Sequence, residues 1–197
     1  HLPRDNYEVS FPLFQYSIEY FRAFGSLPTW VYSLQGGVWF EPLANNYTLL
    51  APYRWVGFLL ATQRVSANVA FKMSLLAGLL LFLWGVYLVG RRLGVSRAFA
   101  TFLLFALFLS SVGQSWLHSE YALSAVVYLP FLWLALFAAR RDERYWVLLA
   151  ALAGQAMNTQ YPHLLVFYAL FAGMTGVWLF RGFRAPSSGI LVASLIV

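Results

Sequence analysis

The chain has 197 residues, of which 61% are hydrophobic, 19% aromatic and only 10% charged. These proportions lie far outside those of a soluble domain and indicate an integral membrane protein. The absence of cysteine from the sequence excludes a disulfide framework, a thiolate metal site and a cysteine nucleophile. The net charge of +6 comes mostly from arginines in short loops between apolar runs, so it is a signal of membrane topology and not of nucleic-acid binding.

Residues 1–67 precede the first long apolar run and mix aromatic with charged side chains. Within them, the stretch FPLFQYSIEYFRAFG predicts an amphipathic helix that lies along the membrane interface and ends at Gly25. The helical spacing places an apolar stripe of Phe14, Ile18 and Phe21 opposite Gln15, Glu19 and Arg22. Farther on, SLPTW, LQGGVWFEP and LLAPYRW predict turns between aromatic anchors.

Apolar windows of near-spanning length follow this first segment. They run roughly over residues 68–89, 96–112, 120–139, 145–157 and 161–180, with a sixth, truncated window from residue 188. Each window should be helical, because a spanning segment must satisfy its backbone hydrogen bonds internally. We therefore expect an all-α integral membrane protein, a polytopic helical bundle with five to six spans. The fourth window is short and needs Asn158 and Thr159 to complete it.

The loops between these windows alternate in charge. Arginines occur in GRRLGVSR, RRDER and RGFR, which together hold eight of the 13 basic residues, whereas GQSWLHSE and NTQYPH contain neither Lys nor Arg. The positive-inside rule places the arginine loops in the cytoplasm, so residues 1–67 and the two uncharged loops face outward. The expected domains are an extracytoplasmic loop with interfacial helices (1–67) and a transmembrane domain (68–197). Since the chain begins without a start methionine or signal peptide and ends within an apolar run, we expect an internal piece of a longer protein.

Acidic, amide and histidine side chains gather on the outer face. They are Asp5, Glu8, Glu41, His118, Glu120, Gln160 and His163. Such a group could form a general-base site, a metal site or a proton relay. A structural interpretation stands beside each: Ser119 and Glu120 fit a helix cap, and His163 after Pro162 fits a hydrated first turn.

The basic residues of this face also have two interpretations. Arg22 and Arg64 could contact lipid headgroups or clamp a phosphate-bearing substrate. Lys72, near the outer end of its helix, should extend its ammonium group to the interface.

Three stretches carry a resemblance to a known family. They are GSLPTWVYSLQGGVWFEPLANNYTLLAPY, HSEYALSAVVYLPFLWLAL and GQAMNTQYPHLLVFY, which follow the early extracytoplasmic Asp5. Together they resemble the YfhO-like bacterial membrane proteins, which belong to the GT-C-type group of polytopic glycosyltransferases. The matching positions are Trp30, Gly36, Gly37, His118, Pro130, Gln160, Pro162 and His163. The sequence departs from the family pattern in WLHSE, which lacks a glycine before the histidine, and in the residue order of TQYPH.

The resemblance implies transfer of a sugar from a polyprenyl-phosphate donor at the outer face of a bacterial inner (plasma) membrane. Asp5 would be the catalytic base. Arg54, His118 and His163 would bind the phosphate, with Gln160 hydrogen-bonding sugar or phosphate and Glu120 completing the substrate site. Some members of the wider group use a divalent cation, but the oxygen ligands Asp5, Glu8 and Glu120 form no recognisable metal-binding motif here.

Two other functions remain open at this point. A non-catalytic subunit could keep the same fold inside a larger membrane complex, with the aromatic outer segment as an interface to other membrane subunits. A transporter could use His118, Glu120 and His163 as an ion path, but the apolar windows that follow Glu120 and His163 carry no charge before the arginine loops.

Overall fold

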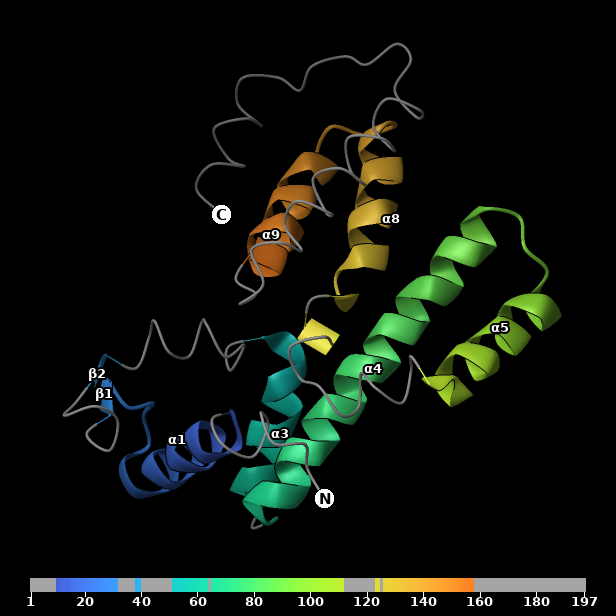
Figure 1. The fold of residues 1–197 in the computed structure, drawn as a ribbon. Helices are drawn as coiled ribbons and strands as arrows, with labels where there is room; N and C mark the ends of the chain where they lie inside the picture. The colour runs from blue at the N-terminus through green and yellow to red at the C-terminus, as the bar shows by residue number, and fades with distance from the viewer. Residues whose placement is uncertain are drawn as a thin grey trace. The chain divides into compact units, whose positions relative to one another are not determined.

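The computed structural model of the chain describes residues 10–31, 38–39, 51–63, 65–111, 123–124 and 126–157, and these are mostly helical (Figure 1). The chain divides into two compact units, His1–Leu81 with Leu107–Ser124 and Phe82–Ala106 with Ala125–Val197. The predicted division into an outer loop (1–67) and a membrane domain (68–197) stays a prediction.

The first helix, α1 (Phe11–Phe24), confirms the amphipathic helix predicted from the sequence. It ends at Gly25, whose φ of 70° is left-handed and whose N–H donates to the carbonyl of Phe21 at 2.8 Å. The buried face differs from the predicted stripe: Leu13, Phe14, Ser17 and Ile18 are buried, while Phe21 is 36% exposed. Packing against the rest of the first unit, rather than the amphipathic pattern alone, selects this face. Whether α1 lies along a membrane interface stays a prediction.

An antiparallel pair of short strands follows α1, where the sequence predicted only turns. Strand β1 (Trp30–Val31) pairs with β2 (Val38–Trp39), with Trp30 opposite Trp39 and Val31 opposite Val38. The two indole rings meet edge to face, with centroids 5.2 Å apart. The all-α prediction is therefore wrong for this segment. The aromatic and β-branched residues of TWV and VWF were the available signal for strands, because such residues favour strands.

Helix α3 (Pro52–Thr62) packs closely on α4 (Ala67–Arg92) through small residues (Figure 1). A Cβ added at Gly57 of α3 would lie 2.7 Å from the carbonyl oxygen of Ala70 and 3.1 Å from Ser74 Cβ. One added at Gly78 would lie 3.0 Å from Tyr53 Cδ2. Because Ala70, Ser74 and Gly78 recur every four residues, they form one small-residue face on α4 that lets α3 approach closely.

Helix α4 is 26 residues long and confirms the first predicted apolar window as a helix. Its length and composition suffice to cross a membrane, and it is the single helix of the described residues that passes this test. The helix ends in a Schellman motif, in which Gly94 has a φ of 84° and the N–H of Val95 donates to the carbonyl of Gly90 at 3.0 Å. The adjacent arginines, Arg91 and Arg92, are exposed, as expected for a solvated loop.

The remaining helices are shorter than the predicted windows, except for one. They are α5 (Arg97–Leu109), α8 (Leu129–Ala139) and α9 (Tyr145–Met157). The bounds of α9 are those predicted from the sequence, and α8 and α9 pack against each other across the exposed turn at residues 140–144 (Figure 1). These helices have 13, 11 and 13 residues, so the predicted five to six spans are not shown by the described part of the chain.

The predicted helix over residues 120–139 is interrupted in the described residues. A turn occupies Val127 and Tyr128, and α8 begins at Leu129 with Pro130 in its first turn. Proline has no N–H to donate and its ring clashes with the carbonyl four residues earlier, so a helix restarts at this position more easily than it continues through it. The prediction of one continuous helix here is wrong, because the proline was given too little weight.

Candidate functional site

Of the six predicted site residues, the structure describes one, Arg54 on α3. The others lie outside the described residues and stay predictions: Asp5, His118, Glu120, Gln160 and His163. The same holds for Glu8 and Glu41. The predicted convergence of these groups at one outer site stays a prediction, and the candidate site described below consists of Arg54 and its surroundings.

The local sequence places Arg54 in the first turn of α3. Ala51 is extended, with φ of −61° and ψ of 137°, and Pro52 follows at the first helical position. Proline suits this position because its φ is already helical and its missing N–H has no intrahelical acceptor there. The N–H of Arg54 then donates to the carbonyl of Ala51 at 2.8 Å. Tyr53, Arg54, Gly57 and Ala61 form the buried face of the helix.

The side chain of Arg54 is fully buried, with 0% of its surface exposed. Its Nη1 donates to Ser74 Oγ on α4 at 2.7 Å, and the serine hydroxyl donates in turn to the carbonyl of Phe71 at 2.7 Å. Ser74 is also fully buried. The guanidinium is thus held by a short polar chain that runs from α3 into the backbone of α4.

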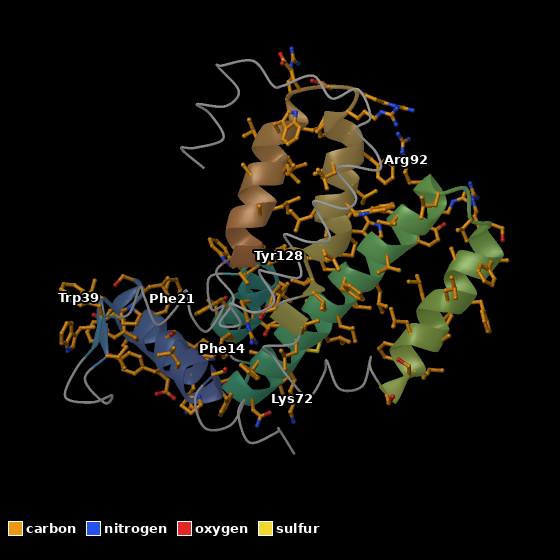
Figure 2. The ribbon with its side chains drawn as sticks, turned by 45° about the horizontal axis from the view of Figure 1, so that its top comes forward. Phe14, Phe21, Trp39, Lys72, Arg92 and Tyr128 are labelled. Atoms are coloured by element: carbon orange, nitrogen blue, oxygen red, sulfur yellow. The ribbon has the colours of Figure 1, made fainter. Side chains whose placement is uncertain are left out.

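Aromatic rings surround the same guanidinium. Its central carbon lies 4.4 Å from the ring centroid of Phe71, 5.6 Å from that of Tyr53 and 6.0 Å from that of Phe14. Phe14 itself reaches in from α1 and meets Phe71 with centroids 5.3 Å apart (Figure 2). Ring faces attract a cation, so these contacts offset part of the cost of burying the charge.

The position of this charge has an electrostatic consequence. The guanidinium carries a full positive charge, and its burial places that charge inside the first unit. A cation in the first turn of a helix also stands at the positive end of the helix dipole, where anions are favoured. Arg54 and the start of α3 therefore make a concentrated positive region inside the first unit. The guanidinium fork has the geometry to bind a carboxylate or phosphate through two parallel hydrogen bonds.

Ser74 is a functional candidate that the sequence reasoning missed. The sequence does contain a signal for it: Ala70, Ser74 and Gly78 are small residues spaced by four positions. Such a spacing indicates a helix face that another helix can approach closely. A serine on such a face is positioned to accept a hydrogen bond across the helix pair.

Arg22 has a role that neither sequence interpretation foresaw. Its Nε donates to the carbonyl of Ala61 at 3.2 Å, and its Nη2 donates to the carbonyl of Val65 at 3.0 Å. These carbonyls lie in the last turn of α3 and just beyond it, where a cation interacts favourably with the negative helix end. Arg22 therefore joins α1 to the end of α3. Whether it also contacts lipid headgroups stays a prediction, and Arg64 lies outside the described residues.

Within the part of the chain that the structure describes, no three acidic or histidine side chains come together in a way that could hold a metal ion. The residues that could hold a divalent cation, Asp5, Glu8 and Glu120, lie outside that part, so whether the protein binds such a cation stays an open question. No protein-family model, curated protein or solved structure matches this chain.

Proposed function

We propose that this chain is part of a bacterial membrane glycosyltransferase of the GT-C type, similar to the YfhO-like proteins. It would transfer a sugar from a polyprenyl-phosphate donor at the extracytoplasmic face of the plasma membrane. The helices of the chain would belong to a polytopic bundle of five to six spans. Asp5 would act as general base toward the acceptor hydroxyl, and the histidines with Gln160 would contact the donor.

The observation that carries this proposal is the burial of Arg54 beside the apolar helix α4. Ionisable side chains among apolar helices cost free energy to place and mark substrate or ion sites by default. Arg54 is fully buried and donates to Ser74, the eighth residue of α4, on the side of that helix that would face outward in the predicted topology. A phosphate on a lipid carrier is an anion that must be held next to hydrocarbon, and this location suits it.

A second observation supports the membrane part of the proposal. Helix α5 exposes large apolar side chains along most of its surface, including Phe102 at 64%, Phe105 at 62% and Leu109 at 70%. Its buried residue is Ala100. A helix that is apolar and exposed over most of its circumference is costly in water and favourable in lipid.

The experiment that tests the role of Arg54 is a binding titration with the full protein in detergent. A polyprenyl phosphate without sugar is the probe, so the identity of the sugar does not enter. Arg54→Lys keeps the charge but loses the bidentate fork, and we expect it to weaken binding about tenfold or more, which corresponds to about 1.4 kcal/mol. The matched control is Arg22→Lys, in which the altered arginine serves backbone carbonyls of α3 and binding should not change. Equal affinity of wild type and Arg54→Lys would remove Arg54 from the donor site.

A second function, the non-catalytic subunit, is favoured by one feature of the same residue. The rings of Phe14, Tyr53 and Phe71 surround the guanidinium, which suits a group that fastens α1, α3 and α4 together. In that case Arg54→Lys would lower the thermal unfolding temperature, and the wild-type protein would bind no polyprenyl phosphate. The titration thus separates the two functions, provided that unfolding temperatures are measured on the same samples.

A further inference from the structure

Apart from the exposed Lys72, the outward faces of α3 and of α4 as far as Leu80 are mostly apolar. On α3, the exposed side chains include Trp55 at 60% and Leu59 at 66%. On α4 they include Val69 at 49%, Met73 at 40% and Leu80 at 54%. These residues are separate from the buried faces through which the two helices meet. Apart from the buried Arg54, helix α3 is therefore mostly apolar both where it packs and where it is exposed, which is typical of a helix surrounded by lipid.

The basic residues of α4 limit where a membrane can lie along this helix. Lys72, the single lysine of the chain, and the pair Arg91 and Arg92 stand toward opposite ends of α4 (Figure 2). Lys72 and Arg91 are 19 positions apart, which at 1.5 Å per residue is about 28 Å along the axis. This length matches the hydrocarbon thickness of a bilayer, about 30 Å. Lys72 therefore marks the outer boundary of the hydrocarbon on α4.

The contacts between α3 and α4 run in opposite directions along the two helices. Gly57 lies against Ala70 and Ser74, Arg54 bonds to Ser74, and Tyr53 lies against Gly78. Lower numbers on α3 thus meet higher numbers on α4, so α3 runs antiparallel to α4 and its first turn is the deeper end. The α4 partners of that turn, Ser74 and Gly78, are two and six residues beyond Lys72, which places the turn about 3 to 9 Å inside the boundary.

We infer that α3 is a re-entrant membrane segment whose first turn enters the outer leaflet, so that Trp55 contacts the acyl chains and Leu59 lies at the hydrocarbon boundary. The sequence had placed these residues in an extracytoplasmic loop. With α3 inserted in this way, Arg54 lies about 3 Å below the level of Lys72, since its partner Ser74 is two residues beyond the lysine. The inference rests on the membrane part of the proposed function and is independent of sugar transfer.

Site-directed spin labelling of the full protein in phosphatidylcholine vesicles tests this placement, and the cysteine-free sequence makes single labels straightforward. The labelled variants are Trp55→Cys, Leu59→Cys and Leu80→Cys, all at exposed positions that should leave the fold intact. Glu19→Cys, on the exposed face of α1, is the water-facing control. Collision rates with oxygen, which concentrates in lipid, and with a water-soluble nickel chelate give the depth of each label.

We expect labels at residues 55 and 80 to collide more with oxygen than with the nickel chelate, and the label at residue 59 to lie about 6 Å shallower than the label at residue 55. The label at residue 19 should show the reverse preference. If residue 80 is lipid-exposed while residue 55 favours the nickel chelate, α3 lies in water and the inference is wrong. Equal depths at residues 55 and 59 would place α3 flat on the surface and would also overturn it. A water-exposed label at residue 80 would instead remove α4 from the membrane, and the proposed function would fall with it.

Discussion

Arg54 Nη1 donates a hydrogen bond to Ser74 Oγ at 2.7 Å, and both side chains are fully buried. The bond joins α3 to α4 and supplies an acceptor to a buried cation. Its value to the fold therefore exceeds that of a bond between neutral groups, because losing the acceptor leaves part of the desolvation cost of the charge uncompensated.

The first prediction concerns Ser74. Ser74→Ala should lower the free energy of unfolding by about 1 to 3 kcal/mol, since the buried guanidinium loses an acceptor. The matched control is Ser17→Ala on α1. Ser17 is also fully buried and donates to a helix carbonyl, that of Leu13, at 2.7 Å, but it serves no charged group. Thermal unfolding in detergent measures both variants. Equal losses would show that the arginine gains nothing from the serine.

The second prediction concerns the close approach of α3 to α4. Gly57→Ala should destabilise the protein by about 1 to 3 kcal/mol, because the new Cβ would lie 2.7 Å from the Ala70 carbonyl oxygen and 2.8 Å from Phe14 Cζ. Gly154→Ala on α9 is the control, since open space surrounds Gly154 and alanine is the better helix former. Its unfolding temperature should stay equal or rise. A Gly57→Ala protein as stable as wild type would contradict the described packing.

The third prediction concerns membrane topology. Single cysteines replacing Ser115 and Thr159 should react with a membrane-impermeant thiol reagent added to intact cells, whereas a cysteine replacing Asp142 should react only after the cells are opened. Asp142 lies in the exposed turn between α8 and α9, beside Arg140 and Arg141. That turn should be cytoplasmic by the positive-inside rule. Labelling of Asp142→Cys in intact cells would reverse the orientation.

The helices were predictable where the sequence signal is local. The end of α1 follows from Gly25, and the bounds of α9 follow from a charged turn on one side and polar residues on the other. The strand pair was missed because only two residues in each strand pair, too few for a periodic pattern. The break before α8 was missed although Pro130 indicates the start of a helix at this position.

The surroundings of the candidate site depend on contacts between distant segments, which local patterns do not encode. The sequence marked Arg54 as a cation in the outer segment but did not predict its full burial. That burial requires Gly57 to meet Ala70 and requires Phe14 to come in from α1. Arg22 illustrates the same limit, since its acceptor Ala61 is 39 positions away. Asp5 and the histidines lie outside the described residues, so their convergence stays a prediction.

The most decisive measurement is sugar transfer by the purified full-length protein in vesicles, from a radiolabelled polyprenyl-phosphate sugar, comparing wild type with Asp5→Asn. An amide cannot accept the proton of the acceptor hydroxyl, so the variant should stay folded and lose about 10²- to 10⁴-fold in rate, the usual contribution of a general base. His163→Ala, measured beside it, should weaken donor binding and lower the rate less. Transfer at the wild-type rate by a folded Asp5→Asn protein would remove the proposed base. A wild-type protein that transfers no sugar from such donors would contradict the proposed function itself.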